Sequence, residues 1–200
     1  MLIADLGDGL SLRQLDDADA EELFDVIDAN RAHLASWMPF VGQTRAPADS
    51  LAFIRAARRQ AEENRGVQLA IIHEGRIIGV AGFHGIDWAR RSTSIGYWLA
   101  AAQQGAGTMT ATVCAMLDHA FGPWNLARVE IRAGVANRRS RAIPERLGFT
   151  QEGVLRAAER IGTRVIDHVV YVMTAAEWGR RYDFSDSRYC CLRVGIQGAR

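Results

Sequence analysis

Seven stretches of the chain are expected to form strands. Apolar and polar residues alternate in residues 10–15, 92–99 and 128–135, and a period of two residues is typical of β-strands with one buried face. The clearest case is residues 128–135, where Val129, Ile131 and Ala133 alternate with charged side chains. Glu74-Gly75 between two of these stretches favours a tight turn, which joins them into a hairpin. The expected strands are residues 10–15, 67–73, 76–82, 92–99, 128–135, 150–159 and 164–173.

Five further stretches have apolar residues at helical spacing or carry the residues that begin and end helices. Pro47 and Gly66 bound one of them, and Asn137 and Gly148 bound another. The expected helices are residues 18–30, 47–65, 108–121, 138–147 and 175–182.

Strands and helices alternate in the middle of the chain, with one hairpin before this region and another after it. This order predicts an α/β (α+β) fold, in which a mixed, mostly antiparallel sheet of about seven strands carries helices on both faces. Residues 30–40 are expected to end the first helix, and residues 86–91 to form a polar connection. We expect residues 1–180 to form one domain and residues 181–200, which lack a clean period, to form a C-terminal tail.

The stretch 92–121 combines an expected strand, a turn of small residues and an expected helix. The turn ends in Gln104-Gly-Ala-Gly107. The first N–H groups of a helix lack helical partners, the helix dipole is positive there, and glycines let the backbone approach an anion. A pyrophosphate would suit this geometry. The patterns of nucleoside triphosphatases and dinucleotide-binding enzymes do not match, and a plain glycine turn is the alternative.

Composition and charge are those of an ordinary globular protein. Among 200 residues 48% are hydrophobic and 24% are charged, and 24 Lys and Arg against 23 Asp and Glu give a net charge of +1. This balance predicts no nucleic-acid or membrane partner, and no apolar run approaches the roughly 18 residues of a membrane helix. The N-terminus does not resemble a signal peptide.

The cysteines and histidines narrow the chemistry further. Cys114, Cys190 and Cys191 lack CxxC spacing, which favours a reducing, cytoplasmic location over a disulfide framework. No metal site is expected, because these histidines are scattered without ligand spacing: His84, His119 and His168.

Three segments resemble a known family. Gln104-Gly-Ala-Gly-Thr-Met109 resembles the [Q/R]-G-x-G-x-[G/A/M] signature of the GNAT superfamily of N-acetyltransferases. Residues 137–149 resemble the N-x-x-S…G-F signature that follows it, and residues 30–40 resemble a segment of the RimJ/RimL ribosomal-protein branch. The resemblance spans residues 8–180. It implies the GNAT fold, acetyl-coenzyme A (acetyl-CoA) as cofactor, and transfer of the acetyl group to a primary amine.

The resemblance also assigns residues to the cofactor. The backbone of Trp98 and Leu99 is expected to hold the pantetheine arm and the thioester carbonyl. The Asn137 side chain is expected to meet the pantetheine, although an asparagine here can also simply cap its helix. N–H groups of the turn are expected to bind the pyrophosphate, and the residues involved are Gln104, Gly105, Ala106, Gly107, Thr108 and Met109.

Many family members place a tyrosine acid four residues after Ser140, where this chain has Pro144. Resemblance to the RimL branch therefore gives Ser140 itself the role of stabilising the leaving thiolate, although its hydroxyl could instead bond its own helix. Proline donates no N–H to the carbonyl four residues back. We expect the Ser140 carbonyl to be free to hold a water or the cofactor arm.

The implied base is Glu159, which would act through water on an α-amine with a pKa of about 8. The alternative for Glu159 is a solvated carboxylate at a strand end. Trp37 and Phe40 are expected to wall the acceptor site, as in the RimJ/RimL branch.

The expected activity is acetylation of a protein N-terminal α-amine by direct attack in a ternary complex, by a homodimeric enzyme. Two alternatives stay open, namely a small-amine acetyltransferase that takes a polyamine or an aminoglycoside, and a non-catalytic acyl-CoA-binding protein. A polycationic acceptor calls for an acidic cleft, and the loops show no acidic cluster, which favours the protein acceptor.

Overall fold

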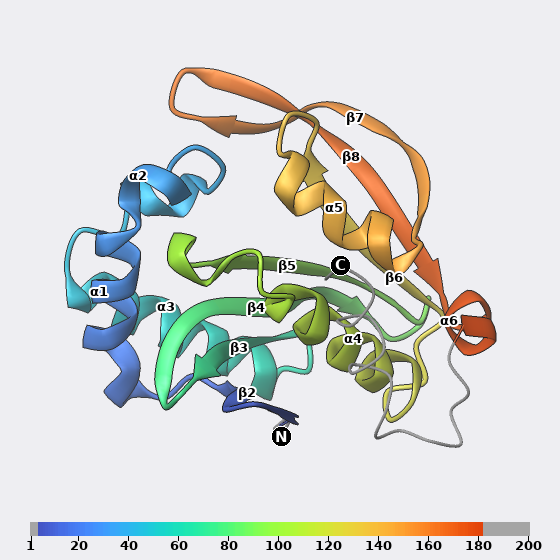
Figure 1. Ribbon diagram of the computed structural model, residues 1–200, viewed down its shortest axis with the longest axis horizontal. Coiled ribbons are helices and arrows are strands. Elements are labelled where there is room, and N and C mark those ends of the chain that lie inside the picture. Colours follow the sequence, from blue (N-terminus) through green and yellow to red (C-terminus); the bar gives the residue numbers. More distant parts are fainter. Residues whose placement is uncertain (1–3, 182–200) are drawn as a thin grey trace, which may run out of the picture.

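Eight strands form one sheet in the order β1-β2-β3-β4-β5-β6-β8-β7 (Figure 1). The computed structural model describes residues 4–181. All neighbouring strands are antiparallel except β5 and β6, which are parallel. The strands are β1 (Ala4–Gly7), β2 (Leu10–Gln14), β3 (Gly66–His73), β4 (Arg76–Asp87), β5 (Ser92–Leu99), β6 (Arg128–Gly134), β7 (Thr150–Ile161) and β8 (Arg164–Thr174).

Helices cover both faces of this sheet, each with its own apolar core (Figure 1). The larger core joins the α4 side chains Met109, Val113 and Leu117 to β2–β6 and β8, and the smaller one packs α1 and α3 on the other face. No helix within residues 4–181 is long and apolar enough to cross a membrane. The α-helices are α1 (Ala20–Ala29), α2 (Arg31–Leu34), α3 (Pro47–Glu62), α4 (Thr108–Phe121), α5 (Arg138–Leu147) and α6 (Ala175–Arg181).

The parallel pair β5–β6 separates halfway along its length. Its ladder runs from Ser92–Arg128 to Ile95–Ile131 and then stops. β5 stays paired with β4 as far as Leu99, and β6 stays paired with β8 as far as Gly134. The β6-facing backbone groups of residues 96–99 are therefore left without a strand partner in the described part of the chain.

The fold class is as predicted, and the differences concern elements with weak sequence signals. β1 was not predicted, so the sheet has eight strands and not about seven. Residues 86–91 are not all a polar connection, because β4 continues to Asp87 and buries Ile86. Residues 30–40 form α2 and a separate 3-10 turn, Pro39–Gly42, in place of one helix end. Apart from Arg181, which ends α6, the expected tail with Cys190 and Cys191 lies outside the described residues.

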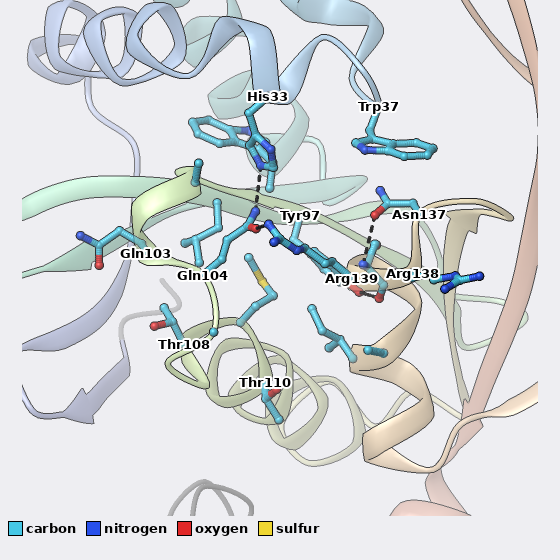
Figure 2. Close-up of a pocket in the computed structure, with 18 of the residues that line it drawn as sticks. His33, Trp37, Tyr97, Gln103, Gln104, Thr108, Thr110, Asn137, Arg138 and Arg139 are labelled. Carbon is cyan, nitrogen blue, oxygen red and sulfur yellow. Dashed lines mark hydrogen bonds between the residues drawn. The ribbon is translucent and has the colours of Figure 1, made fainter. Parts of the chain in front are cut away.

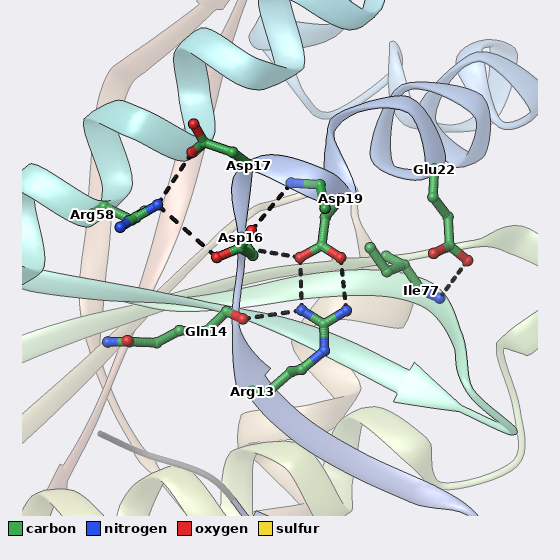
Figure 3. Close-up of polar contacts among 9 residues, drawn as sticks. Arg13, Gln14, Asp16, Asp17, Asp19, Glu22, Arg58 and Ile77 are labelled. Atoms are coloured by element: carbon green, nitrogen blue, oxygen red, sulfur yellow. Dashed lines mark hydrogen bonds and ion pairs between the residues drawn. The ribbon is translucent and has the colours of Figure 1, made fainter.

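A partly buried ion pair fixes the start of α1 to the sheet (Figure 3). Arg13 on β2 donates two hydrogen bonds to the carboxylate of Asp19, at 2.6 and 2.8 Å, and the N–H of Asp16 donates a third at 2.7 Å. Asp19 is 8% exposed. Burial disfavours its charged form, but the hydrogen bonds from Arg13 and Asp16 outweigh burial and lower the pKa of Asp19 below its ordinary value.

We predict that Asp19→Asn lowers the free energy of unfolding by about 1–3 kcal/mol at neutral pH, because it leaves the Arg13 guanidinium without its partner. A depressed folded-state pKa means that the carboxylate stabilises the fold above the unfolded-state pKa of about 3.9. This contribution is lost as pH falls through the folded-state pKa. Urea unfolding of both proteins over a range of acidic pH should therefore show their stabilities converging.

The matched control is Asp28→Asn, since Asp28 forms an exposed pair with Arg31 at 2.8 Å. An exposed pair is worth about 0.5 kcal/mol. If the two variants lost equal free energies of unfolding, the Arg13–Asp19 pair would not be the more important of the two.

Candidate active site

A cavity of about 690 Å³ lies beside the separating ends of β5 and β6 (Figure 2). Its walls come from the α2 region, the end of β5, the turn and first residues of α4, and the segment that leads from β6 into α5. The residues that line it are His33, Leu34, Trp37, Met38, Tyr97, Trp98, Leu99, Ala101, Gln103, Gln104, Gly105, Gly107, Thr108, Met109, Thr110, Ala136, Asn137, Arg138, Arg139, Ser140, Ala142, Ile143 and Arg146.

The turn before α4 needs its glycines for conformational reasons. Gly105 and Gly107 have φ of +89° and +86°, and nothing lies within 4 Å of a Cβ built on either. A side chain would have room there but would be held in the left-handed region, which costs L-residues about 1–2 kcal/mol. Gly107 is also the N-cap of α4, and no described side chain caps this helix. The first N–H groups of α4 are thus left for a ligand in the cavity.

The cavity is strongly biased toward anions. Arg138, Arg139 and Arg146 line it, and no Asp or Glu of the described residues does. Gln104 bridges its walls (Figure 2), because Arg139 Nη1 donates to Gln104 Oε1 at 2.8 Å and Gln104 Nε2 lies 2.8 Å from Nε2 of His33. The guanidinium charges and the positive end of the α4 dipole act together on any anion that enters.

The start of α5 presents Asn137 and Ser140 to the cavity. Asn137 is the N-cap, and its Oδ1 accepts a hydrogen bond from the Ser140 N–H at 3.2 Å. Pro144 lies inside α5 as predicted. However, the prediction that the Ser140 carbonyl is free for a water or the cofactor arm is wrong. The hydroxyl of Tyr97 on β5 donates to that carbonyl at 3.1 Å.

Ten of the thirteen residues selected from the sequence line the cavity, and three do not. Ala106 belongs to the turn but not to the lining. Phe40 packs against Trp98, with ring centroids 6.2 Å apart, behind the cavity wall. Glu159 lies on β7. The ten lining residues are Trp37, Trp98, Leu99, Gln104, Gly105, Gly107, Thr108, Met109, Asn137 and Ser140.

Glu159 nevertheless lies on the face of the sheet that Trp37 covers. A Cβ on Gly134 would come within 3.1 Å of the Trp37 ring. Gly134 pairs with His168, and Glu159 pairs with Ile166, two residues before His168 on β8. Paired residues and alternate residues share a face, so these side chains gather beside Trp37. The Glu159 carboxylate lies 3.4 Å from His168 Nε2.

Sequence reasoning gave no role to Tyr97 or to the three arginines of the cavity. One signal for Arg138 and Arg139 was available. They occupy the first turn of α5, where the helix dipole disfavours cations, so their presence there indicates an anionic ligand. Tyr97 offered no such signal, because its contact with Ser140 joins residues 43 positions apart.

Comparison with known proteins gives this site its class. The family described as acetyltransferase (GNAT) domain matches residues 10–150 of the chain. The putative ribosomal N-acetyltransferase YdaF of Bacillus subtilis (strain 168) is 32% identical over 180 residues, covering 89% of this chain and 98% of that protein. The chain therefore belongs to the GNAT acetyltransferase family. It is an N-acetyltransferase, and acetyl-CoA is its acetyl donor.

Solved structures agree with this assignment. The acetyltransferase MccE, which confers self-immunity to microcin C7 and was crystallised with acetyl-CoA and AMP, is 30% identical with a TM-score of 0.81, covering 84% of this chain and 94% of its own. A RimL ribosomal L7/L12 acetyltransferase in complex with coenzyme A is 23% identical with a TM-score of 0.84, covering 88% and 99% of the two chains, and so shares the fold.

The residues of the cavity fit such a cofactor. A polyanionic nucleotide needs cations and N–H donors, which the arginines and the start of α4 supply without an opposing carboxylate. An amide-containing arm needs backbone partners, and the unpaired edge of residues 96–99 offers them.

We predict that Gly107→Ala weakens coenzyme A binding about tenfold, because the strained residue displaces the turn and its N–H groups. Isothermal titration calorimetry measures the affinity. Gly162→Ala is the matched control, since Gly162 also has a positive φ, +58°, with nothing within 4 Å of its Cβ, but lies in the β7–β8 turn. The turn is not the cofactor site if the two variants bind coenzyme A equally well.

Proposed function

We propose that this protein is an N-α-acetyltransferase that moves the acetyl group of acetyl-CoA to the α-amine of a protein N-terminus, with a ribosomal protein as acceptor. The observation that supports this most is that a cationic cavity adjoins, across Trp37, a sheet face that bears a carboxylate. The similarity to the putative ribosomal N-acetyltransferase YdaF over 89% of the chain favours the same acceptor class. A ribosomal acceptor would be met in the cytoplasm.

In this proposal the turn from Gln104 to Met109, Ala106 included, binds the pyrophosphate through its N–H groups. The open backbone edge at Trp98 and Leu99 binds the pantetheine arm and the thioester carbonyl. Asn137 uses its Oδ1 to cap Ser140, which leaves its amide Nδ2 to donate to the pantetheine. When bound, the cofactor supplies an acetyl thioester that an amine can attack directly.

We assign the base to Glu159. An α-amine has a pKa of about 8, so it is mostly protonated at neutral pH and must lose a proton before it attacks. The Glu159 carboxylate can accept this proton through water. Its neighbour His168, 3.4 Å away, holds the carboxylate on the Trp37 side of the sheet.

Ser140 has the second chemical role. Its hydroxyl belongs to the cavity wall, and a hydroxyl can donate a hydrogen bond to a thiolate as negative charge develops on the sulfur. A serine is too weak an acid to be the proton source, so we assign it stabilisation and not protonation.

We propose that Trp37 forms the wall of the acceptor site and that Phe40 contributes to it indirectly, through Trp98. Trp37 lines the cavity, lies against Gly134 and has the Arg164 guanidinium 5.9 Å from its ring centroid. Phe40 reaches the site through Trp98, against which it packs. An extended N-terminal peptide would lie along this aromatic surface.

The acceptor is tested by incubating the protein with acetyl-CoA and a panel of ribosomal-protein N-terminal peptides, polyamines and aminoglycosides, while free thiol is monitored. We expect turnover with peptides that have a free α-amine and none with N-blocked versions of the same peptides. Turnover with the small amines alone would favour the small-molecule alternative. Coenzyme A binding without turnover on any acceptor would favour a non-catalytic role.

We predict that Glu159→Gln lowers kcat about 100-fold and leaves KM for acetyl-CoA within about twofold, because only the proton acceptor is lost. The deficit should shrink above the α-amine pKa of about 8, where the acceptor is already neutral. Steady-state kinetics across this pH range measure both effects. Glu21→Gln, on the exposed surface of α1, is the control. A Glu159→Gln enzyme as active as the control would remove Glu159 from the mechanism.

We further propose that the enzyme is a homodimer in which two copies pair through β7. This strand is the edge of the sheet and is exposed along most of its length, including Val154 at 49%.

We predict that Val154→Lys converts this dimer to a monomer, because it places two ammonium groups side by side at the two-fold axis. Light scattering after size exclusion measures the mass, and Val165→Lys, on the neighbouring strand and equally exposed at 49%, is the control. A wild-type monomer, or a dimer that survives Val154→Lys, would contradict pairing through β7.

A further inference from the structure

We propose that Tyr97 is a positioning residue for the acetyl transfer. Its hydroxyl takes the place of the helix N–H that Pro144 removes from the Ser140 carbonyl, and so holds the Ser140 hydroxyl at the cavity wall. This inference rests on the role of Ser140 proposed above. It concerns residues on two different elements, β5 and α5, that the sequence gave no reason to connect.

The need for Tyr97 arises from the backbone of α5. A helical carbonyl normally accepts the N–H of the residue four positions later, which for Ser140 is residue 144. Residue 144 is proline, so this N–H does not exist, and the proline ring also crowds the carbonyl. An unpaired carbonyl in a partly buried position destabilises its surroundings.

Tyr97 satisfies this carbonyl from across the cavity. Its hydroxyl donates to Ser140 O at 3.1 Å, and its ring packs against the larger core, so the donor is held firmly. Burial raises the pKa of the Tyr97 hydroxyl well above its ordinary value, more than the interaction with Ser140 lowers it. The hydroxyl therefore stays protonated and donates throughout the physiological pH range.

The position of this bond connects it to the reaction. Tyr97 precedes Trp98 and Leu99 on the open edge of β5, and Ser140 faces the same cavity from α5. Within residues 4–181, the Tyr97–Ser140 bond is the hydrogen bond that ties β5 to α5 across the divergence. It sets how far the Ser140 hydroxyl lies from the strand edge that would hold the thioester.

A second tyrosine that contacts α5 provides a contrast. Tyr171 on β8 accepts a hydrogen bond from Arg141 at 2.8 Å and donates one to Glu145 at 2.5 Å. These contacts also anchor α5, but through the side chains of Arg141 and Glu145 and not through the Ser140 carbonyl. Tyr171→Phe thus removes an anchoring hydroxyl and leaves the hydrogen bond to the Ser140 carbonyl in place.

The test is a double-mutant cycle on the full-length enzyme, with Tyr97→Phe, Pro144→Ala and the double variant. Tyr97→Phe should lower kcat about tenfold and leave KM for acetyl-CoA within about twofold, since the ring stays and only the donor is lost. Pro144→Ala restores a helix N–H to Ser140 O. In that background Tyr97→Phe should change kcat by less than about twofold.

Amide hydrogen exchange gives a readout that does not depend on turnover. In the ligand-free protein, Tyr97→Phe should speed exchange in the first turns of α5, and adding Pro144→Ala should restore protection. Tyr171→Phe should also speed exchange in α5, and adding Pro144→Ala should not restore that protection. Thermal melting and coenzyme A titration of each variant show whether it is folded at the assay temperature.

The outcomes separate the two hypotheses. No turnover by the wild-type enzyme on any acceptor would contradict the proposed function, and full activity of Ser140→Ala would contradict the role of Ser140. An active wild-type enzyme whose kcat is unchanged by Tyr97→Phe, or falls equally with and without Pro144, would overturn the role of Tyr97 alone. If Tyr97→Phe does not fold by itself, rescue of its folding and activity by Pro144→Ala supports the proposal, and failure of that rescue overturns it.

Discussion

The active site depends on the place where β5 and β6 stop pairing. The parallel ladder ends at Ile95 and Ile131, yet neither strand leaves the sheet, because β4 holds β5 and β8 holds β6. The gap therefore has rigid edges. One edge offers unpaired backbone groups, and the turns that follow the two strands lead directly into α4 and α5. The cavity, its cationic lining and the position of Ser140 at its wall all result from this single interruption of the ladder.

The charges around the gap favour a bound anion at the expense of helix stability. Gly107 leaves the start of α4 without a side-chain cap, and Arg138 and Arg139 stand in the first turn of α5, where the dipole disfavours them. Each choice weakens a helix in isolation. Departures from local preference of this kind are expected at functional sites, where a bound ligand compensates for them.

The opposite side of the gap has a different chemistry. Gly134 has no side chain, so Trp37 can lie directly on β6, and any larger residue there would push the indole away. The pairing register then brings His168 and Glu159 to the same face. In the proposed function the cofactor residues and the acceptor residues are thus on opposite faces of the sheet, and Trp37 belongs to both groups because it also lines the cavity.

α5 shows how tertiary contacts repair a local defect. Pro144 lies one turn after Ser140 and has no N–H to donate to the Ser140 carbonyl. The Tyr97 hydroxyl donates that hydrogen bond instead. Arg141, Glu145 and Tyr171 hold the other side of the same helix to β8. Ser140 is consequently fixed by residues from two strands, although its own helix contributes little.

Much of this was readable from the sequence, since period-two and helical patterns, the glycine turn and the Asn137 cap are local signals. They predicted the fold class and nearly all the elements. Ten of the residues that line the cavity were predicted through the resemblance of three segments to GNAT signatures. β1 was missed because it is short and lies at the edge of the sheet, and the end of β4 because its polar residues imitate a loop.

The tertiary structure alone decided which distant residues meet. No local pattern encodes the partnership of Tyr97 with Ser140, of Gln104 with His33 and Arg139, or of Glu159 with His168. Each depends on strand register and on how far β5 and β6 separate, and these are properties of the packed sheet. Short-range preferences therefore determined what the elements are, and long-range packing determined what they do together.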